Sequence, residues 1–153
     1  MHIPYTICFL YQHDQLLMLL RNKAPNKGKW NGLGGKIEEN ESLEESILRE
    51  IKEESGLTVH DILYKGVVTW NNKSGMHVFT GTDYSGDIHS TYEGQVGWKP
   101  LEWVLSSNEV VSNIPYFIQT VLFDSKPFEH AFTYNEDGEI TVYKKSSLLL
   151  KTT

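Results

Sequence analysis

The sequence is poor in cysteine and in long apolar runs. Its 153 residues contain a single cysteine, Cys8, which excludes an internal disulfide and, among apolar neighbours, predicts a core position. The longest apolar runs, YTICFLY and LLMLL, are far too short to cross a membrane. The first residues, MHIPYT, lack the basic region and the long apolar stretch of a secretory signal peptide. We therefore expect a cytoplasmic protein with no membrane partner.

Basic residues are also scarce. The chain has 14 Lys and Arg against 20 Asp and Glu, for a formal net charge of −6. This balance argues against a surface built to coat nucleic acid, so no stable nucleic-acid complex is expected. The six histidines show no metal-ligand spacing, and GLGGKI lacks the spacing and the hydroxyl of a phosphate-binding P-loop.

The remaining composition is that of a globular domain, with 39% hydrophobic and 22% charged residues. No repeat or linker divides the chain, so residues 1–153 are expected to form one domain. Strand-like segments outnumber helical ones and alternate with them, which predicts a mixed α/β fold. Strands are expected at 3–11, Gln15–Arg21, VTW, MHVFTG, 96–98 and a final hairpin around EDG; helices at Leu43–Ser55 and Ile114–Phe123; and a loop at 22–36.

The helix expected at Leu43–Ser55 has recognisable ends. Ser42 and Glu45 form the S-x-x-E pattern of a capping box, and Gly56 follows where a left-handed residue ends a helix. With Leu43 as origin, Ile47 falls at about 40° and Ile51 at about 80° on the helical wheel. These residues define the buried stripe of the helix.

Three acidic side chains gather at the C-terminal end of this helix. On the same wheel Glu54 falls at about 20°, within the apolar stripe, and Glu50 at about 340°, beside it. Together with Glu53 they repel one another, at roughly 0.2–0.5 kcal/mol per pair, and oppose the helix dipole. A solvated acidic face is the ordinary explanation, but acids beside the apolar stripe fit it poorly. A divalent cation with hard oxygen ligands, such as Mg²⁺, explains the pattern better.

The surrounding residues resemble the signature of the Nudix hydrolases. Gly35 is followed after five residues by Glu41 and after seven more by REIKEESGL at 49–57. This matches every position of G-x5-E-x7-R-E-U-x-E-E-x-G-U, where U is aliphatic. The resemblance implies an α/β/α sandwich with a mixed sheet, and hydrolysis of a nucleoside diphosphate linked to another moiety.

The resemblance also implies roles for the signature residues. Glu50, Glu53 and Glu54 would bind Mg²⁺, with Mn²⁺ able to substitute, and one of them would act as general base on the attacking water. Arg49 would orient these carboxylates through charge-assisted hydrogen bonds.

The loop before the signature, KWNGLGGKIE, resembles that of the MutT-like 8-oxo-dGTP diphosphatases. By that likeness Asn31 reads the base, and the Gly34 carbonyl is a metal ligand. An asparagine amide offers both a donor and an acceptor, which suits a purine edge. Asn31 before a glycine is alternatively a turn residue.

Weaker likeness extends along most of the chain. It makes Thr6 a pocket residue, Arg21 a phosphate contact and Trp70 an aromatic wall beside the base. Glu93, five residues before Trp98, matches a family glutamate near the metal. Alternatively, Arg21 is an ordinary exposed arginine, Trp70 is a core residue and Glu93 is a surface acid.

One region departs from the pattern. Some family members carry a tryptophan and paired aspartates before the C-terminal helix, whereas this chain reads EVVSNIPYF. Asn113 stands at about the corresponding place. It would either contact the purine or serve as N-cap of the helix from Ile114.

These observations predict an Mg²⁺-dependent pyrophosphohydrolase of a purine nucleoside triphosphate, with 8-oxo-dGTP as first candidate. Its products would be the nucleoside monophosphate and pyrophosphate, and its role would be sanitation of the nucleotide pool. The alternatives are a Nudix hydrolase of another nucleotide, such as a pterin triphosphate or another damaged dNTP, and a nucleotide-binding module without catalysis. The partner in each case is a small nucleotide, and the sequence predicts no oligomeric state.

Overall fold

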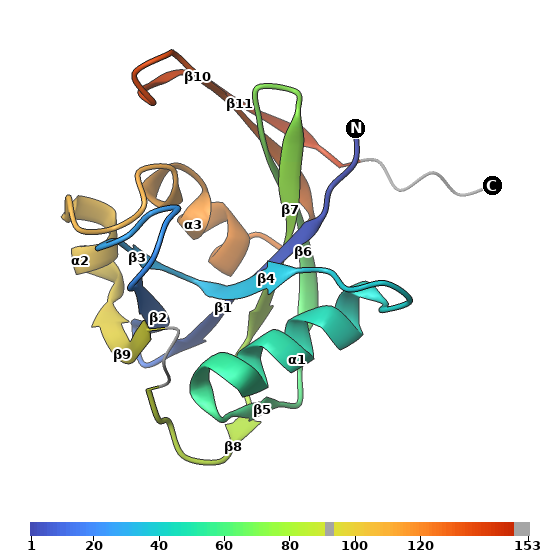
Figure 1. Ribbon diagram of the computed structural model, residues 1–153, viewed down its shortest axis with the longest axis vertical. Helices are drawn as coiled ribbons and strands as arrows, with labels where there is room; N and C mark the ends of the chain where they lie inside the picture. Colours follow the sequence, from blue (N-terminus) through green and yellow to red (C-terminus); the bar gives the residue numbers. More distant parts are fainter. Residues whose placement is uncertain (91–93, 149–153) are drawn as a thin grey trace.

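A mixed sheet with helices on both faces forms the body of the protein, which a computed structural model describes for residues 1–90 and 94–148 (Figure 1). Its elements are β1 (Tyr5–Gln12), β2 (Gln15–Arg21), β3 (Trp30–Asn31), β4 (Leu33–Lys36), α1 (Leu43–Ser55), β5 (Thr58–Val59), β6 (Leu63–Trp70), β7 (Ser74–Gly81), β8 (Tyr84–Ser85), β9 (Gly94–Pro100), α2 (Leu101–Ser106), α3 (Ile114–Phe123), β10 (Phe128–Tyr134) and β11 (Ile140–Ser147). Within these residues, none of the helices has the length and apolar character needed to cross a membrane.

Strand β1 joins the two parts of the sheet. Its first part pairs with β7 in parallel and with β4 antiparallel, and beyond β7 the order continues through β6 and β10 to β11. Its last residues form a hairpin with β2 through His13 and Asp14, both with positive φ. Strand β2 in turn pairs with β3 and β9. The mixed α/β sandwich expected from the sequence is confirmed.

The residues of β1 alternate between two apolar cores. Ile7 and Phe9 pack toward α3, where the Phe9 and Phe117 rings lie 5.9 Å apart. Cys8 points to the other face and packs in the cluster that contains Ile47 of α1. This period of two is what a strand buried on both faces requires. Cys8 is fully buried, which confirms its expected core position.

Helix α1 begins and ends at the expected residues. The Glu45 N–H donates to Ser42 Oγ over 3.1 Å, and the Ser42 N–H donates to Glu45 Oε1 over 2.9 Å. Gly56 has φ of 85° and its N–H donates to the Lys52 carbonyl. The reciprocal cap and the left-handed glycine therefore fix both boundaries.

The expectation of a loop over the whole of 22–36 is wrong, because β3 and β4 lie within it. The reason is the close approach of β4 to β1: a Cβ at Gly34 would lie 2.0 Å from the Thr6 carbonyl oxygen. Glycine makes this pairing possible, but a glycine-rich segment has the composition of a loop and is predicted as one. The short elements α2, β5 and β8 were also not predicted, and β9 is longer than the expected strand at 96–98.

Candidate active site

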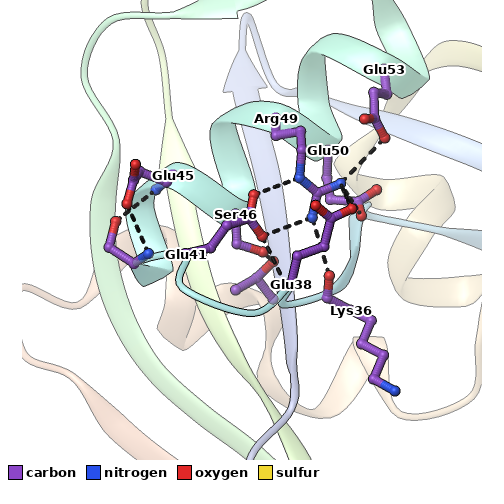
Figure 2. A network of polar contacts seen from close by, with 10 residues as sticks. Lys36, Glu38, Glu41, Glu45, Ser46, Arg49, Glu50 and Glu53 are labelled. Atoms are coloured by element: carbon purple, nitrogen blue, oxygen red, sulfur yellow. Dashed lines mark hydrogen bonds and ion pairs between the residues drawn. The ribbon is translucent and has the colours of Figure 1, made fainter.

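Arg49 is the centre of a polar network on α1 (Figure 2). Its Nε and Nη2 donate to the two carboxylate oxygens of Glu41 over 2.6 and 3.0 Å. Its Nη1 donates to Glu50 Oε1 over 3.0 Å and to Glu53 Oε2 over 3.3 Å, and Nη2 also donates to the Lys36 carbonyl. The planar guanidinium thus binds Glu41 in a bidentate pair and holds two further acids.

This network changes the electrostatics of the acidic helix. The hydrogen bond from Arg49 is the main cause that lowers the pKa of the Glu41 carboxyl, and the same bond raises the pKa of Arg49. A positive charge among the acids offsets part of their mutual repulsion. The expected orienting role of Arg49 agrees with this geometry. The sequence patterns had assigned no role to Glu41, its closest partner.

Two of the three acidic side chains, Glu54 and Glu50, contact strand β4. Glu54 is only 3% exposed, and its Oε1 accepts a hydrogen bond from the Gly34 N–H over 2.8 Å. Glu50 is 9% exposed, and a Cβ at Gly35 would lie 2.5 Å from its Oε1. Glu53 is exposed. The helical wheel therefore placed Glu54 and Glu50 correctly, and Gly35 leaves the space that the Glu50 carboxylate occupies beside the strand.

The donor set suits a hard divalent cation, because it consists of carboxylate oxygens beside a backbone strand. Among residues 1–90 and 94–148, however, no three His, Cys, Asp or Glu side chains are arranged so that they could hold a metal ion. One oxygen of Glu50 and one of Glu53 accept from Arg49, and one oxygen of Glu54 accepts from the Gly34 N–H. Ligation by all three glutamates would require these side chains to turn.

A cavity of about 800 Å³ is lined in part by residues 34–36 of β4, the strand that Glu50 and Glu54 contact, while no residue of α1 lines it. It brings together residues that are far apart in the sequence and that were predicted to bind substrate or metal. These lining residues are Thr6, Arg21, Asn31, Gly34, Trp70 and Asn113. The cavity therefore collects every predicted substrate residue of the described chain.

Polar wall residues of the cavity are held by local hydrogen bonds. Thr6 is buried, and its Oγ1 lies 3.3 Å from the Ser46 Oγ of α1. Arg21 Nε donates to the Pro25 carbonyl over 2.7 Å. Asn31 Oδ1 accepts from the Gly32 N–H over 2.9 Å. The residue lies in the short strand β3 and not in a turn, so its alternative as a turn residue is wrong, and it lines the cavity.

Aromatic side chains form another part of the wall. Trp70 is half-buried and lies 6.4 Å from the Tyr5 ring, at an interplanar angle of 33°. Both rings line the cavity, so Trp70 is a wall residue rather than a fully buried core residue. Tyr5 was not among the predicted site residues, although its neighbour Thr6 was.

Asn113 occupies the N-cap position of α3, but its side chain makes no capping hydrogen bond there. The residue is 6% exposed, and its Oδ1 has no hydrogen-bond partner in the described part of the chain. The side chain lines the cavity instead. The N-cap alternative is thus correct for the backbone position and wrong for the side chain.

Glu93 lies outside the described residues, so its role as a metal ligand stays a prediction.

Comparisons with known proteins agree with this geometry. The NUDIX domain model matches residues 1–121. With 91% of each chain covered, the sequence is 27% identical to the uncharacterized Nudix hydrolase YvcI of Bacillus subtilis (strain 168) and 28% identical to the oxidized purine nucleoside triphosphate hydrolase of Danio rerio. The crystal structure of a MutT protein from Bacillus halodurans matches with a TM-score of 0.79 and 29% identity, over 92% of this chain and 95% of that one. The MutT protein of Methanosarcina mazei matches with a TM-score of 0.66 and 27% identity, over 79% and 95%.

The family match covers most of the chain, and the signature residues Glu50 of α1 and Gly35 of β4 are in contact, with Gly35 on the cavity wall. The fold is that of the MutT structures. The chain therefore belongs to the Nudix hydrolase family, as a MutT-like enzyme that hydrolyses phosphoric anhydride bonds.

Proposed function

We propose that this enzyme hydrolyses a purine nucleoside triphosphate, with 8-oxo-dGTP as its substrate, to the nucleoside monophosphate and pyrophosphate. The observation that carries the proposal is the cavity beside β4, which combines aromatic rings with side-chain amides. Two of its wall residues, Gly34 and Gly35, also contact the buried Glu54 and Glu50. The relatives from Danio rerio and Mus musculus, at 28% and 25% identity, are named oxidized purine nucleoside triphosphate hydrolases, which supports a purine substrate. Such an enzyme would act in the cytoplasm and remove oxidised nucleotides before they enter DNA.

The wall of the cavity suits a purine base. A purine has two flat faces, and Tyr5 and Trp70 supply ring surface against which such a face can pack. Its edges carry hydrogen-bond donors and acceptors, and the amides of Asn31 and Asn113 can pair with either kind. Thr6 adds a hydroxyl on the same wall.

The acidic cluster would hold the metal of the reaction. Nudix hydrolases generally use divalent metal ions, and Glu50, Glu53 and Glu54, with the Gly34 carbonyl, are the proposed ligands for Mg²⁺. When bound, the cation would neutralise charge on the phosphates and lower the pKa of the attacking water.

The side chains of the chain itself have separate tasks in this proposal. Arg49 is a positioning residue that keeps Glu41, Glu50 and Glu53 in one charged network. One glutamate of α1 accepts the proton of the attacking water as general base. Arg21, at the end of β2 and on the cavity wall, provides positive charge for the triphosphate.

Product analysis in ¹⁸O-labelled water tests this proposal. With Mg²⁺ present, 8-oxo-dGTP should yield the monophosphate and pyrophosphate, with the label in only one of them, and a chelator should abolish turnover. Glu54→Gln keeps an acceptor for the Gly34 N–H but removes the carboxylate charge, so it should retain the fold and lower kcat by at least about 100-fold. Release of the diphosphate and inorganic phosphate, or full turnover without metal, would contradict the proposal.

A further inference from the structure

Strand β3 is joined to the segment before α3 by backbone hydrogen bonds. The Trp30 N–H donates to the Glu109 carbonyl over 2.8 Å, and the Val111 N–H donates to the Trp30 carbonyl over 3.0 Å. These two bonds make a parallel bridge between Trp30 and Val110. Trp30 therefore connects two parts of the chain that are far apart in the sequence.

Each of the two connected parts supplies wall residues of the cavity. Asn31, which directly follows Trp30, lines the cavity, and so do Val111 and Ser112 in the segment before α3. Trp30 is not among the described residues that line it. The Trp30 backbone thus fixes how the two walls lie relative to each other, while its side chain packs elsewhere.

The Trp30 ring is held by side chains of β9 and α2. The residue is 7% exposed, and its ring lies 6.3 Å from the Trp103 ring at an interplanar angle of 85°. The Lys99 ammonium lies 4.3 Å from the centre of the Trp30 ring and 5.1 Å from that of Trp103. Both distances are within the range of cation–π attraction, which is strongest for tryptophan.

The two rings are the contacts that the Lys99 charge makes. Lys99 is half-buried, and β9 holds its backbone in register with Leu16 of β2. In the ranges 1–90 and 94–148 every ion pair involves Arg49, so no acid there pairs with Lys99. A partly desolvated ammonium gains more from a ring than an exposed one does. Lys99 therefore favours one placement of the Trp30 ring.

We propose that Lys99 is a positioning residue for substrate binding: its ammonium holds the Trp30 ring, and the Trp30 backbone in turn fixes the cavity walls that contain Asn31 and Val111. This inference rests on the proposed function and deepens it. The part of the substrate concerned is the nucleobase, because a rigid planar ring loses contact area when the walls around it move apart.

The test compares Lys99→Met with Lys99→Arg. The first variant keeps an unbranched side chain against the rings without the charge, and the second keeps a cation that stacks on aromatic rings. The probe is the neutral nucleoside 8-oxo-2′-deoxyguanosine, since attraction between a lysine and phosphates does not contribute to its binding. By calorimetry, Lys99→Met should raise Kd about 3- to 10-fold, and Lys99→Arg should stay within about twofold of the wild type.

Turnover of 8-oxo-dGTP should change in the same sense. In Lys99→Met, KM should rise with Kd while kcat stays within about twofold, because the acidic network on α1 is untouched.

Amide hydrogen exchange provides a measurement that needs no ligand. The Val111 N–H, which is bonded to the Trp30 carbonyl, should exchange at least about threefold faster in Lys99→Met, because that bond opens more often when the ring is less firmly held.

Lys145→Met is the matched control. The Lys145 ammonium lies 5.0 Å from the centre of the Phe128 ring, and neither residue lines the cavity. This variant removes the same charge and the same kind of contact, and it should leave both Kd and the exchange of Val111 unchanged.

Four results would each overturn the inference: a wild-type Kd or wild-type exchange of Val111 in Lys99→Met, an equal loss in Lys99→Arg, or an equal loss in Lys145→Met. If Lys99→Met weakens nucleoside binding as expected but the wild type hydrolyses no nucleoside triphosphate, the inference stands and the proposed function fails. Turnover of 8-oxo-dGTP by the wild type, with the same KM in Lys99→Met, overturns the inference alone. A wild type that binds no nucleoside overturns both.

Discussion

At the scale of single residues, the acidic helix is organised by the groups that face its carboxylates. Arg49 is hydrogen-bonded to Glu41, Glu50 and Glu53, and the Gly34 N–H binds Glu54. The acidic side chains therefore take part in a hydrogen-bonded network and do not form a solvated acidic face. The helical period predicted that Glu50 and Glu54 border or enter the buried stripe. Arg49 belongs to the same helix, but the Gly34 N–H that binds Glu54 comes from β4, which no pattern within the helix indicates.

Gly35 gives a direct test of the contact between this network and β4. Gly35→Ala would place a Cβ 2.5 Å from Glu50 Oε1, so the carboxylate must move. We expect a loss of about 10- to 100-fold in kcat/KM, since displacements of this kind at a catalytic group cost that much. The unfolding free energy should fall by less than about 1 kcal/mol, because only the end of the Glu50 side chain has to shift.

Gly97→Ala in β9 is the control for a glycine in a strand. A Cβ there would meet only the Trp30 ring at 3.9 Å, an ordinary contact. It should leave kcat/KM at the wild-type value in the same assay. Wild-type kinetics in Gly35→Ala would show that the close packing of Glu50 on the strand is irrelevant to the reaction.

At the scale of elements, predictability followed the strength of local signals. Helix α1 was predicted to the residue because the cap formed by Ser42 and Glu45 and the left-handed Gly56 are local features. Strand β3 was not predicted because it has only two residues, and β4 was not predicted because its glycines are required by neighbours distant in sequence. The hairpin of β10 and β11 was expected from its alternation, but its contact with the cavity depends on how the chain packs.

The hairpin also contains a buried histidine that makes stability depend on pH. His130 is fully buried, and its Nδ1 lies 2.7 Å from the Tyr143 hydroxyl. Burial, with a smaller effect from Lys145, lowers the pKa of His130 to about 4. Because the folded pKa lies below the unfolded value, the neutral histidine stabilises the fold above about pH 6.5, and this contribution is lost as the pH falls toward 4.

We therefore expect the unfolding free energy, measured with urea, to drop by roughly 1–3 kcal/mol between pH 7 and pH 4 through His130 alone. In His130→Phe, which keeps a ring at this position, most of that slope should disappear. The contribution of half-buried His77, whose pKa is also lowered by burial, would remain. An unchanged slope in His130→Phe would exclude His130 as its source.

At the scale of the whole molecule, the candidate site exists only because the sheet assembles distant segments. The cavity takes residues from β1, β2, β3, β4, β6, β7 and β10 and from the turn before α3. The family resemblance predicted Thr6, Arg21, Asn31, Trp70 and Asn113 as substrate residues, and all of them line it. Composition and periodicity alone would have identified only the acidic helix. Tyr5 and Tyr134 also line the cavity, but no local sequence pattern marks them as site residues. The pairing of β1 with β7 places Tyr5, and the hydrogen bond from the Tyr134 N–H to Asn71 Oδ1 places Tyr134.

The central claim, that this cavity selects an oxidised purine nucleotide for metal-dependent hydrolysis, is tested most directly by one comparison. The measurement is kcat/KM for 8-oxo-dGTP and for dGTP under the same conditions, with Mg²⁺ present and then chelated. The account predicts a strong preference for 8-oxo-dGTP, of at least about tenfold for one discriminating hydrogen bond, and loss of both activities with the metal. Equal kcat/KM values for the two nucleotides would contradict it and return Asn31 and Asn113 to structural roles.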